Sequence, residues 1–131
     1  MSTLAVGTIK SISSAAPVFQ NTSGTEKGQL VKAWANLDQT GSQSIRDSFN
    51  VSSVTDVSVG TTYVNYTNNM SNTDYCGVIY NNATSTLAIN TFGNNYVGGM
   101  ICDADKIQVS AYTGSGFIDS KLFTVIVIGD N

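Results

Sequence analysis

The sequence has no histidine, and its 131 residues include one proline, one tryptophan and two cysteines. Without histidine, neither a Ser-His-Asp triad nor a Cys-His pair can form, and histidine-based metal sites are excluded. The only glutamate, Glu26, follows a turn-like stretch and precedes Lys27, so paired-carboxylate catalysis would have to use aspartates. We therefore expect a protein that is not an enzyme and that uses no cofactor.

Charge is also scarce, at 11% of residues where about 25% is typical of globular proteins. The net charge is −3 and no basic cluster exists, which argues against nucleic-acid binding. The polar surface must be built mainly from Ser, Thr, Asn and Gln. Because charge commonly keeps protein surfaces apart, one explanation for its scarcity is packing against copies of the same chain or within a larger assembly.

Long hydrophobic runs are missing as well. The longest, LFTVIVIG, is far shorter than the ~20 residues that span a bilayer, and the N-terminus lacks the apolar region of a signal peptide. We expect synthesis in the cytoplasm and no membrane insertion.

Few side chains remain that could perform chemistry. Asp103 and Asp105 would share one face of an extended segment, but a hard cation needs six to eight oxygen ligands, and a turn or strand end explains the DAD stretch more simply. Cys76 and Cys102 lie among apolar neighbours, where a thiol behaves as a buried hydrophobe with a raised pKa. We expect no metal site and no nucleophile, and either free thiols or one disulfide.

What the sequence does contain is short runs rich in Val, Ile, Thr and Tyr between clusters of Gly, Asn, Asp and Ser, which predict an all-β fold. A glycine turn before Thr62 predicts one hairpin, and the turn NNATS predicts a second between residues 75–80 and 86–90. Asn50 is a plausible bend between two of the runs. The predicted strands are Leu30–Leu37, Ser44–Phe49, Val51–Thr55, Thr62–Thr67, Tyr75–Tyr80, Thr86–Asn90, Lys106–Tyr112 and Lys121–Ile128.

The alternation within these runs predicts an antiparallel, jelly-roll-like β-sandwich over residues 29–131. Residues 121–128 are apolar on both faces, which suits either a strand in the middle of a core or one between the core and a neighbouring subunit. Residues 1–28 have sparse apolar residues and a strong turn, NTSGTEKG, and are predicted to form an extended N-terminal arm. The alternative is an ordinary edge strand, Leu4–Ile12.

Aromatic and amide side chains in polar loops are the candidate contacts for a ligand or partner, because they suit stacking and hydrogen bonding to sugars or proteins. Packing in the core or against a subunit is the competing explanation for each aromatic. The candidates are Phe92, Asn94, Asn95, Tyr96, Tyr112 and Phe117.

The middle half of the chain carries a resemblance to a known group. A Lys-Ala-Trp strand, the strand IRDSFNVSS, a glycine turn, the strand YVNYT and the stretch MSNTDY follow one another in the order and spacing seen in small tail-fibre-like and virion surface proteins of tailed bacteriophages, including marine and cyanobacterial phages. The chain resembles these proteins, although its turns LDQTG and DVSVGTTY depart from their glycine-rich loops.

The resemblance implies a non-enzymatic β-sandwich protein, commonly a homotrimer, displayed on the virion. We expect a knob or fibre tip that contacts other virion proteins and a glycan or protein of the host envelope. The alternatives are a capsid decoration protein and a stand-alone carbohydrate-binding module. The resemblance also suggests a structural clamp, in which Trp34 offers an apolar wall while Arg46 stacks on an aromatic ring or bonds backbone carbonyls. The competing explanation is that Arg46 pairs with Asp47 or Asp56 at the surface.

Overall fold

The structure is a computed structural model that describes residues 5–10, 19–28, 30–81, 88–92, 102–113 and 116–129. Every element within these ranges is a β-strand, so the predicted all-β class is confirmed. No helix in these ranges is long and apolar enough to cross a membrane. The strands are β1 (Phe19–Gln20), β2 (Glu26–Gly28), β3 (Val31–Asp38), β4 (Ser44–Phe49), β5 (Val51–Ser58), β6 (Thr61–Tyr66), β7 (Cys76–Asn81), β8 (Ala88–Phe92), β9 (Lys106–Thr113), β10 (Gly116–Phe117) and β11 (Phe123–Ile128).

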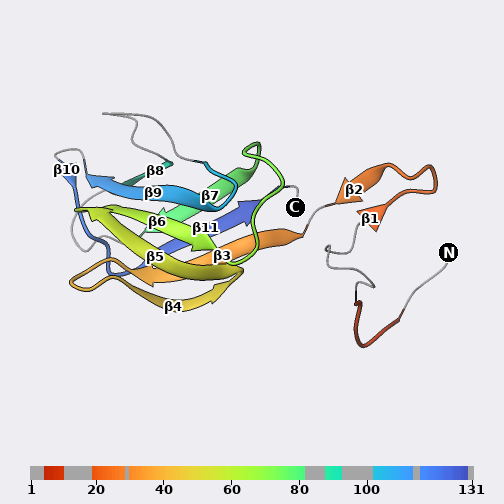
Figure 1. The fold of residues 1–131 in the computed structure, drawn as a ribbon, viewed down its shortest axis with the longest axis horizontal. Helices are drawn as coiled ribbons and strands as arrows, with labels where there is room; N and C mark the ends of the chain where they lie inside the picture. Colours follow the sequence, from red (N-terminus) through yellow and green to blue (C-terminus); the bar gives the residue numbers. More distant parts are fainter. Residues whose placement is uncertain are drawn as a thin grey trace.

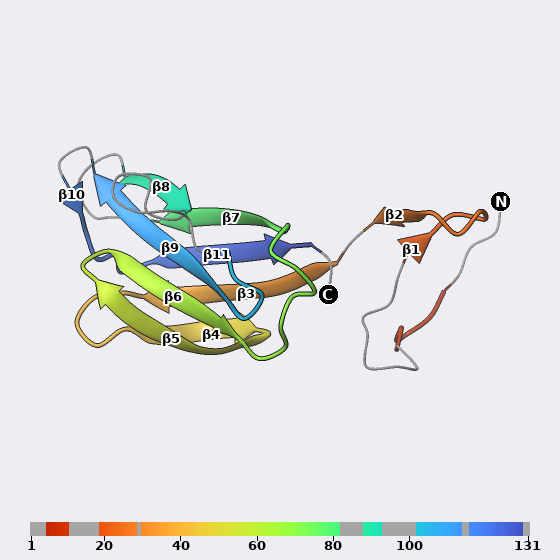
Figure 2. The same ribbon diagram turned by 45° about the horizontal axis from the view of Figure 1, so that its top comes forward.

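Two antiparallel sheets face each other and form the predicted sandwich (Figures 1 and 2). The first, which we call the four-stranded sheet, has the order β4-β3-β11-β7. The second, the five-stranded sheet, has the order β10-β9-β6-β5, with β8 also paired to β9. The chain changes sheets several times, so strands distant in sequence, such as β3 and β11, lie side by side.

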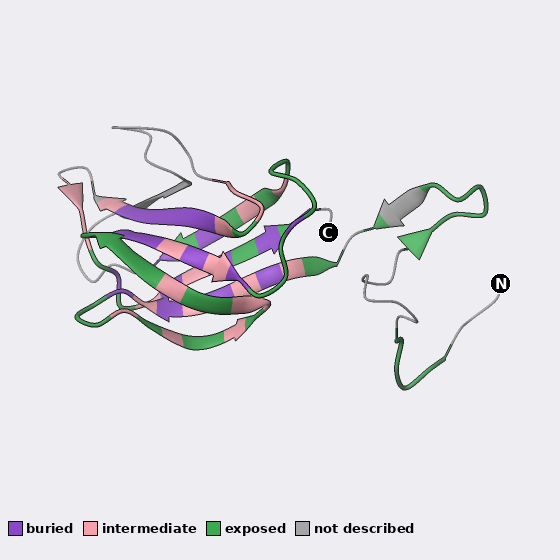
Figure 3. Ribbon diagram, viewed as in Figure 1, coloured by how far each residue is buried: buried purple, intermediate pink, exposed green. Residues whose placement is uncertain are grey.

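The core lies between the sheets and follows the two-residue period of the strands. On β3 every second side chain is buried, and the same holds for β11 (Figure 3). Full burial of one large apolar side chain stabilises the fold by about 1.5 to 3 kcal/mol. The buried core residues are Ala33, Ala35, Leu37, Val64, Tyr66, Met70, Ile79, Ile107, Val109, Ala111, Phe123, Val125 and Val127.

Asn50 is the point at which the chain leaves the four-stranded sheet and enters the five-stranded one. Its φ is 56°, in the left-handed region that asparagine tolerates better than most residues. The side chain fixes this geometry, because its Nδ2 donates to the carbonyl of Lys32 (2.9 Å) and to that of Asn68 (3.0 Å). The bend predicted at Asn50 is therefore a crossover between two strands of different sheets.

The hairpin predicted before Thr62 exists between β5 and β6, with Gly60 in its turn at φ +69°. The second predicted hairpin is wrong. β7 pairs with β11 in the four-stranded sheet, whereas β8 pairs with β9 in the other. Both strands do exist, but neighbours in sequence are not neighbours in the sheet, because each pairs with a strand from later in the chain.

The N-terminal region differs from the alternative of an edge strand at Leu4–Ile12, since residues 5–10 form no strand. A small hairpin follows, in which β1 pairs with β2 around a turn where Asn21 Oδ1 accepts hydrogen bonds from the backbone of Ser23 (3.1 Å) and Thr25 (2.8 Å). Figures 1 and 2 both place this hairpin beyond the end of the sandwich at which β3 begins.

Candidate interaction surface on the four-stranded sheet

A row of apolar side chains crosses the outer face of the four-stranded sheet. The strand register aligns Phe49 of β4 with Trp34 of β3, Trp34 with Ile126 of β11, and Ile126 with Val78 of β7. All four point away from the core, because the buried residues of β3 and β11 occupy the alternate positions. No charged residue belongs to this row.

The row continues into the next positions of β7 and β11. Val78 is 55% exposed, Phe49 54% and Tyr80 58%, while Ile128 lies beside the row at the end of β11. We call Trp34, Phe49, Val78, Tyr80, Ile126 and Ile128 the apolar face. It explains why residues 121–128 are apolar on both sides: the odd-numbered residues of β11 fill the core, and Ile126 and Ile128 lie on this face.

The outer face of the five-stranded sheet has a different chemistry. Asn65 of β6 donates from its Nδ2 to Ser53 Oγ (3.0 Å) and Thr55 Oγ1 (3.1 Å) of β5. Beside them, the ammonium of Lys106 lies 5.8 Å from the ring centre of Tyr63. One side of the sandwich is thus apolar across its width, whereas the other presents hydroxyl and amide groups around Asn65, with Val57 exposed elsewhere on β5.

Trp34 and Arg46 lie on adjacent strands, but the direct neighbour of Trp34 is Phe49 and not Arg46. Arg46 occupies a β-bulge, because the pairing steps from Asn36–Asp47 to Leu37–Ile45 and leaves it without a partner in the ladder. The structure therefore does not place Arg46 beside the Trp34 wall, but it does show one of the two contacts that the clamp hypothesis gave Arg46, a hydrogen bond to a backbone carbonyl.

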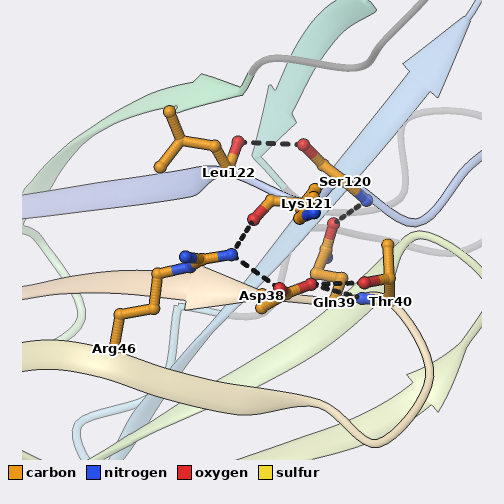
Figure 4. Close-up of polar contacts among 7 residues, drawn as sticks. All are labelled: Asp38, Gln39, Thr40, Arg46, Ser120, Lys121 and Leu122. Atoms are coloured by element: carbon orange, nitrogen blue, oxygen red, sulfur yellow. Dashed lines mark hydrogen bonds and ion pairs between the residues drawn. The ribbon is translucent and has the colours of Figure 1, made fainter.

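Arg46 instead closes one corner of the sandwich (Figure 4). Its Nη2 donates to Asp38 Oδ2 (2.6 Å) and to the backbone carbonyl of Lys121 (2.9 Å), so it connects β4 with the end of β3 and with the segment entering β11. The partner in the ion pair is Asp38, and the expected alternatives Asp47 and Asp56 are not used. The bulge accounts for this choice, since it turns the side chain toward the end of β3.

Asp38 is held by more than the arginine. Its Oδ1 accepts hydrogen bonds from the Thr40 hydroxyl (2.5 Å) and the Thr40 backbone N–H (3.0 Å). These two bonds and, to a smaller extent, the Arg46 guanidinium hold the pKa of Asp38 below its ordinary value, against some desolvation.

Behind this corner, buried Gln39 joins the two sheets. Its Oε1 accepts from the Ser120 backbone N–H (3.1 Å; Figure 4). Its Nε2 donates to Thr62 Oγ1 (3.0 Å) of the five-stranded sheet. A buried amide is costly unless it is hydrogen-bonded, so these contacts fix the spacing of the sheets at this end.

The aromatic candidates are only partly brought together. Tyr112 and Phe117 face each other across β9 and β10, with ring centres 5.2 Å apart and planes at 73°. Phe92 belongs to β8 and pairs with Val109, but the structure does not describe its side chain. Asn94, Asn95 and Tyr96 lie outside the described residues. A T-shaped ring pair is a common packing arrangement and does not by itself identify a ligand site.

The acidic pair lies at a turn before β9, in agreement with the simpler interpretation. The ammonium of Lys106 lies 3.0 Å from Asp103 Oδ2 and 3.5 Å from Asp105 Oδ1, so one cation serves both carboxylates. The hydroxyl of nearby Tyr75 donates to the carbonyl of Asp103 (3.1 Å). This arrangement can hold the turn closed.

The two thiols are unbonded and differ in environment. Burial raises the pKa of the Cys102 thiol, as expected for a cysteine among apolar neighbours. Cys76 does not fit that expectation, because it is exposed at the start of β7, opposite Ile128.

Sequence reasoning missed Phe49, Val78 and Tyr80 as parts of a surface, although the two-sided apolar pattern of residues 121–128 was a signal for it. Comparison with known proteins adds no further assignment: no family model, no curated protein and no solved structure matches this chain.

Proposed function

We propose that this protein is a non-enzymatic structural protein of a bacteriophage virion, exposed on the particle as a knob or fibre tip that contacts the host envelope. The observation that carries the proposal is the apolar face, a contiguous row of apolar side chains across one side of the sandwich. Soluble monomers rarely expose a contiguous apolar patch of this kind unless it binds something.

The two outer faces suit a protein with an inner and an outer side. Apolar side chains would pack against other subunits of an assembly, here a homotrimer and its neighbouring virion proteins. The hydroxyl and amide groups around Asn65, Ser53 and Thr55 would then face the solvent and the host surface. The resemblance of the middle of the chain to phage fibre-like proteins supports the same assignment.

The test is to locate the protein on purified particles of the phage that encodes it. Antibodies raised against the chain should label the tail end of washed particles in electron micrographs, in few copies, and purified protein should compete with particles for attachment to host cells. Labelling spread over the head, with attachment unaffected, would replace the fibre-tip assignment by capsid decoration. Particles free of the protein would refute the virion assignment altogether.

A further inference from the structure

We infer that the apolar face is covered by a second copy of this chain, and that the N-terminal arm of that copy lies on it. The inference rests on the proposed function for its premise that the protein assembles, and it assigns the surface that does so. It begins from two sets of exposed apolar side chains, one on the four-stranded sheet and one on the arm.

The apolar face is too small to form a stable interface by itself. Four strands about 4.8 Å apart and paired over about six residues, at about 3.3 Å per residue, present a flat area of about 400 Å². A standard stable interface buries about 800 Å² on each partner. Side chains enlarge the accessible area beyond the flat value, but a partner that touches only this face still falls short of a secure contact.

The arm exposes apolar groups of the kind that would complete the contact. Val6 is 52% exposed and Ile9 60%, Phe19 is exposed as well, and exposed Leu30 lies between the arm and β3. These residues have no place in the core described above, and the β1–β2 hairpin projects away from its own sandwich in both views (Figures 1 and 2). A single association event could remove both sets of side chains from water.

The arm is also continuous with the face. Leu30 immediately precedes β3, and Ile128 of β11 pairs with Val31 at the same end of the sheet. A copy whose arm crosses this end would pass over Ile128 and Cys76 before reaching Val78. The centre of the apolar face is uncharged, and the nearby charged residues Lys32, Asp47 and the Asp38–Arg46 pair lie at its margins. A second copy can therefore cover the apolar side chains without burying an unpaired charge.

The experiment uses the full chain and measures mass by light scattering over a range of concentrations. Wild-type protein should show a mass that is a multiple of 13.8 kDa, and Val78→Lys should reduce it to that of a single chain. Val57→Lys is the matched control, because Val57 is 44% exposed on β5 of the other sheet. Equal masses for these two variants would overturn the inference, provided that circular dichroism shows both folded.

The role of the arm is tested by Ile9→Asp against Thr8→Asp, which adds the same charge to the same segment. Ile9→Asp should weaken assembly and Thr8→Asp should not. Identical masses for the two variants would refute the part of the inference that concerns the arm.

Cys76 reports directly on whether the face is covered, with Cys102 of the same chain as an internal reference. Maleimide should label Cys76 slowly in assembled wild type and rapidly in the Val78→Lys variant. A wild-type protein that is monomeric with Cys76 protected would show that the chain covers its own face, and the inference would fail. Because the virion assignment is tested separately on particles, either proposal can fail while the other stands.

Discussion

At the scale of single residues, Asn50 stabilises the crossover between the two sheets in two ways. It adopts a left-handed conformation, and its amide links the beginning of β3 with the loop after β6, since its Oδ1 also accepts from the backbone N–H of Asn68 (2.8 Å). The conformation and the hydrogen bonds are separate contributions, and substitution can separate them.

Asn50→Gly keeps the left-handed conformation but loses the side-chain bonds, whereas Asn50→Ala loses both. Each lost bond costs about 1 kcal/mol, and a non-glycine residue pays a further 1 to 2 kcal/mol, approximately, for the left-handed region. Urea unfolding should therefore rank wild type above Asn50→Gly and Asn50→Gly above Asn50→Ala. Equal stability of the two variants would show that backbone strain plays no part.

Asp38 gives the fold a dependence on pH. Its pKa is lowered in the folded state, so it stabilises the protein above the pKa of an unfolded aspartate, about 3.9, and this stabilisation is lost as the pH falls through the folded value. Asp38→Asn should lower the melting temperature at about pH 7, and the difference from wild type should shrink below about pH 4. Asp56→Asn, on exposed β5, controls for the loss of one negative charge. A difference that stays constant with pH would contradict this account.

At the scale of elements, the β5–β6 turn is packed closely against backbone atoms of other segments. A Cβ at Gly60 would lie 2.6 Å from the carbonyl oxygen of Ile118 and 2.8 Å from that of Ala111, and both are backbone atoms that cannot swing away. Gly41, with a similar φ of +64°, has open space around it.

Gly60→Ala should therefore destabilise the protein by more than about 3 kcal/mol, since steric overlap adds to the strain at positive φ, whereas Gly41→Ala should cost only about 1 to 2 kcal/mol. Comparison of the two denaturation midpoints isolates the steric part. Similar midpoints would mean that the segment containing Ile118 yields easily.

The elements also show how much could be predicted from the sequence. Alternation located β3, β6, β7, β9 and β11 to within about two residues, because a half-buried strand has the same two-residue period wherever it pairs. Pairing partners were harder: β7 and β8 were expected to form a hairpin and belong to different sheets, since register depends on the whole sandwich.

The candidate surface was less predictable than the strands. The row from Phe49 to Val78 comes from four strands distant in sequence, and only their register aligns it. Likewise, the ion pair between Arg46 and Asp38 depends on the bulge in β4, which no local sequence pattern predicted. The two-sided apolar character of residues 121–128 was visible beforehand, but whether its second face was core or surface was not.

At the scale of the whole molecule, the four-stranded sheet depends on contacts between distant parts of the chain. β11 lies between β3 and β7, so the ladder of residues 31–38 is closed by residues 123–128. In folds dominated by such non-local pairing, loops must close before the stabilising contacts form, and small domains of this type refold in about milliseconds to seconds.

Stopped-flow refolding, followed by the fluorescence of Trp34, should therefore be slow, in the range of about milliseconds to seconds. Refolding complete within microseconds would contradict the importance of the pairing between β3 and β11.

Phe123→Ala, in the centre of the core, should lower the free energy of unfolding by about 3 to 5 kcal/mol.

The central position of β11 has a consequence for how the protein is made. A ribosome produces β3 early and β11 after every other described strand, so the growing chain carries an incomplete sheet until Phe123–Ile128 has emerged. A product terminated before that point would lack the strand that joins β3 to β7, so the edges of both strands would stay unpaired. The four-stranded sheet is therefore completed only in chains whose translation has passed Ile128.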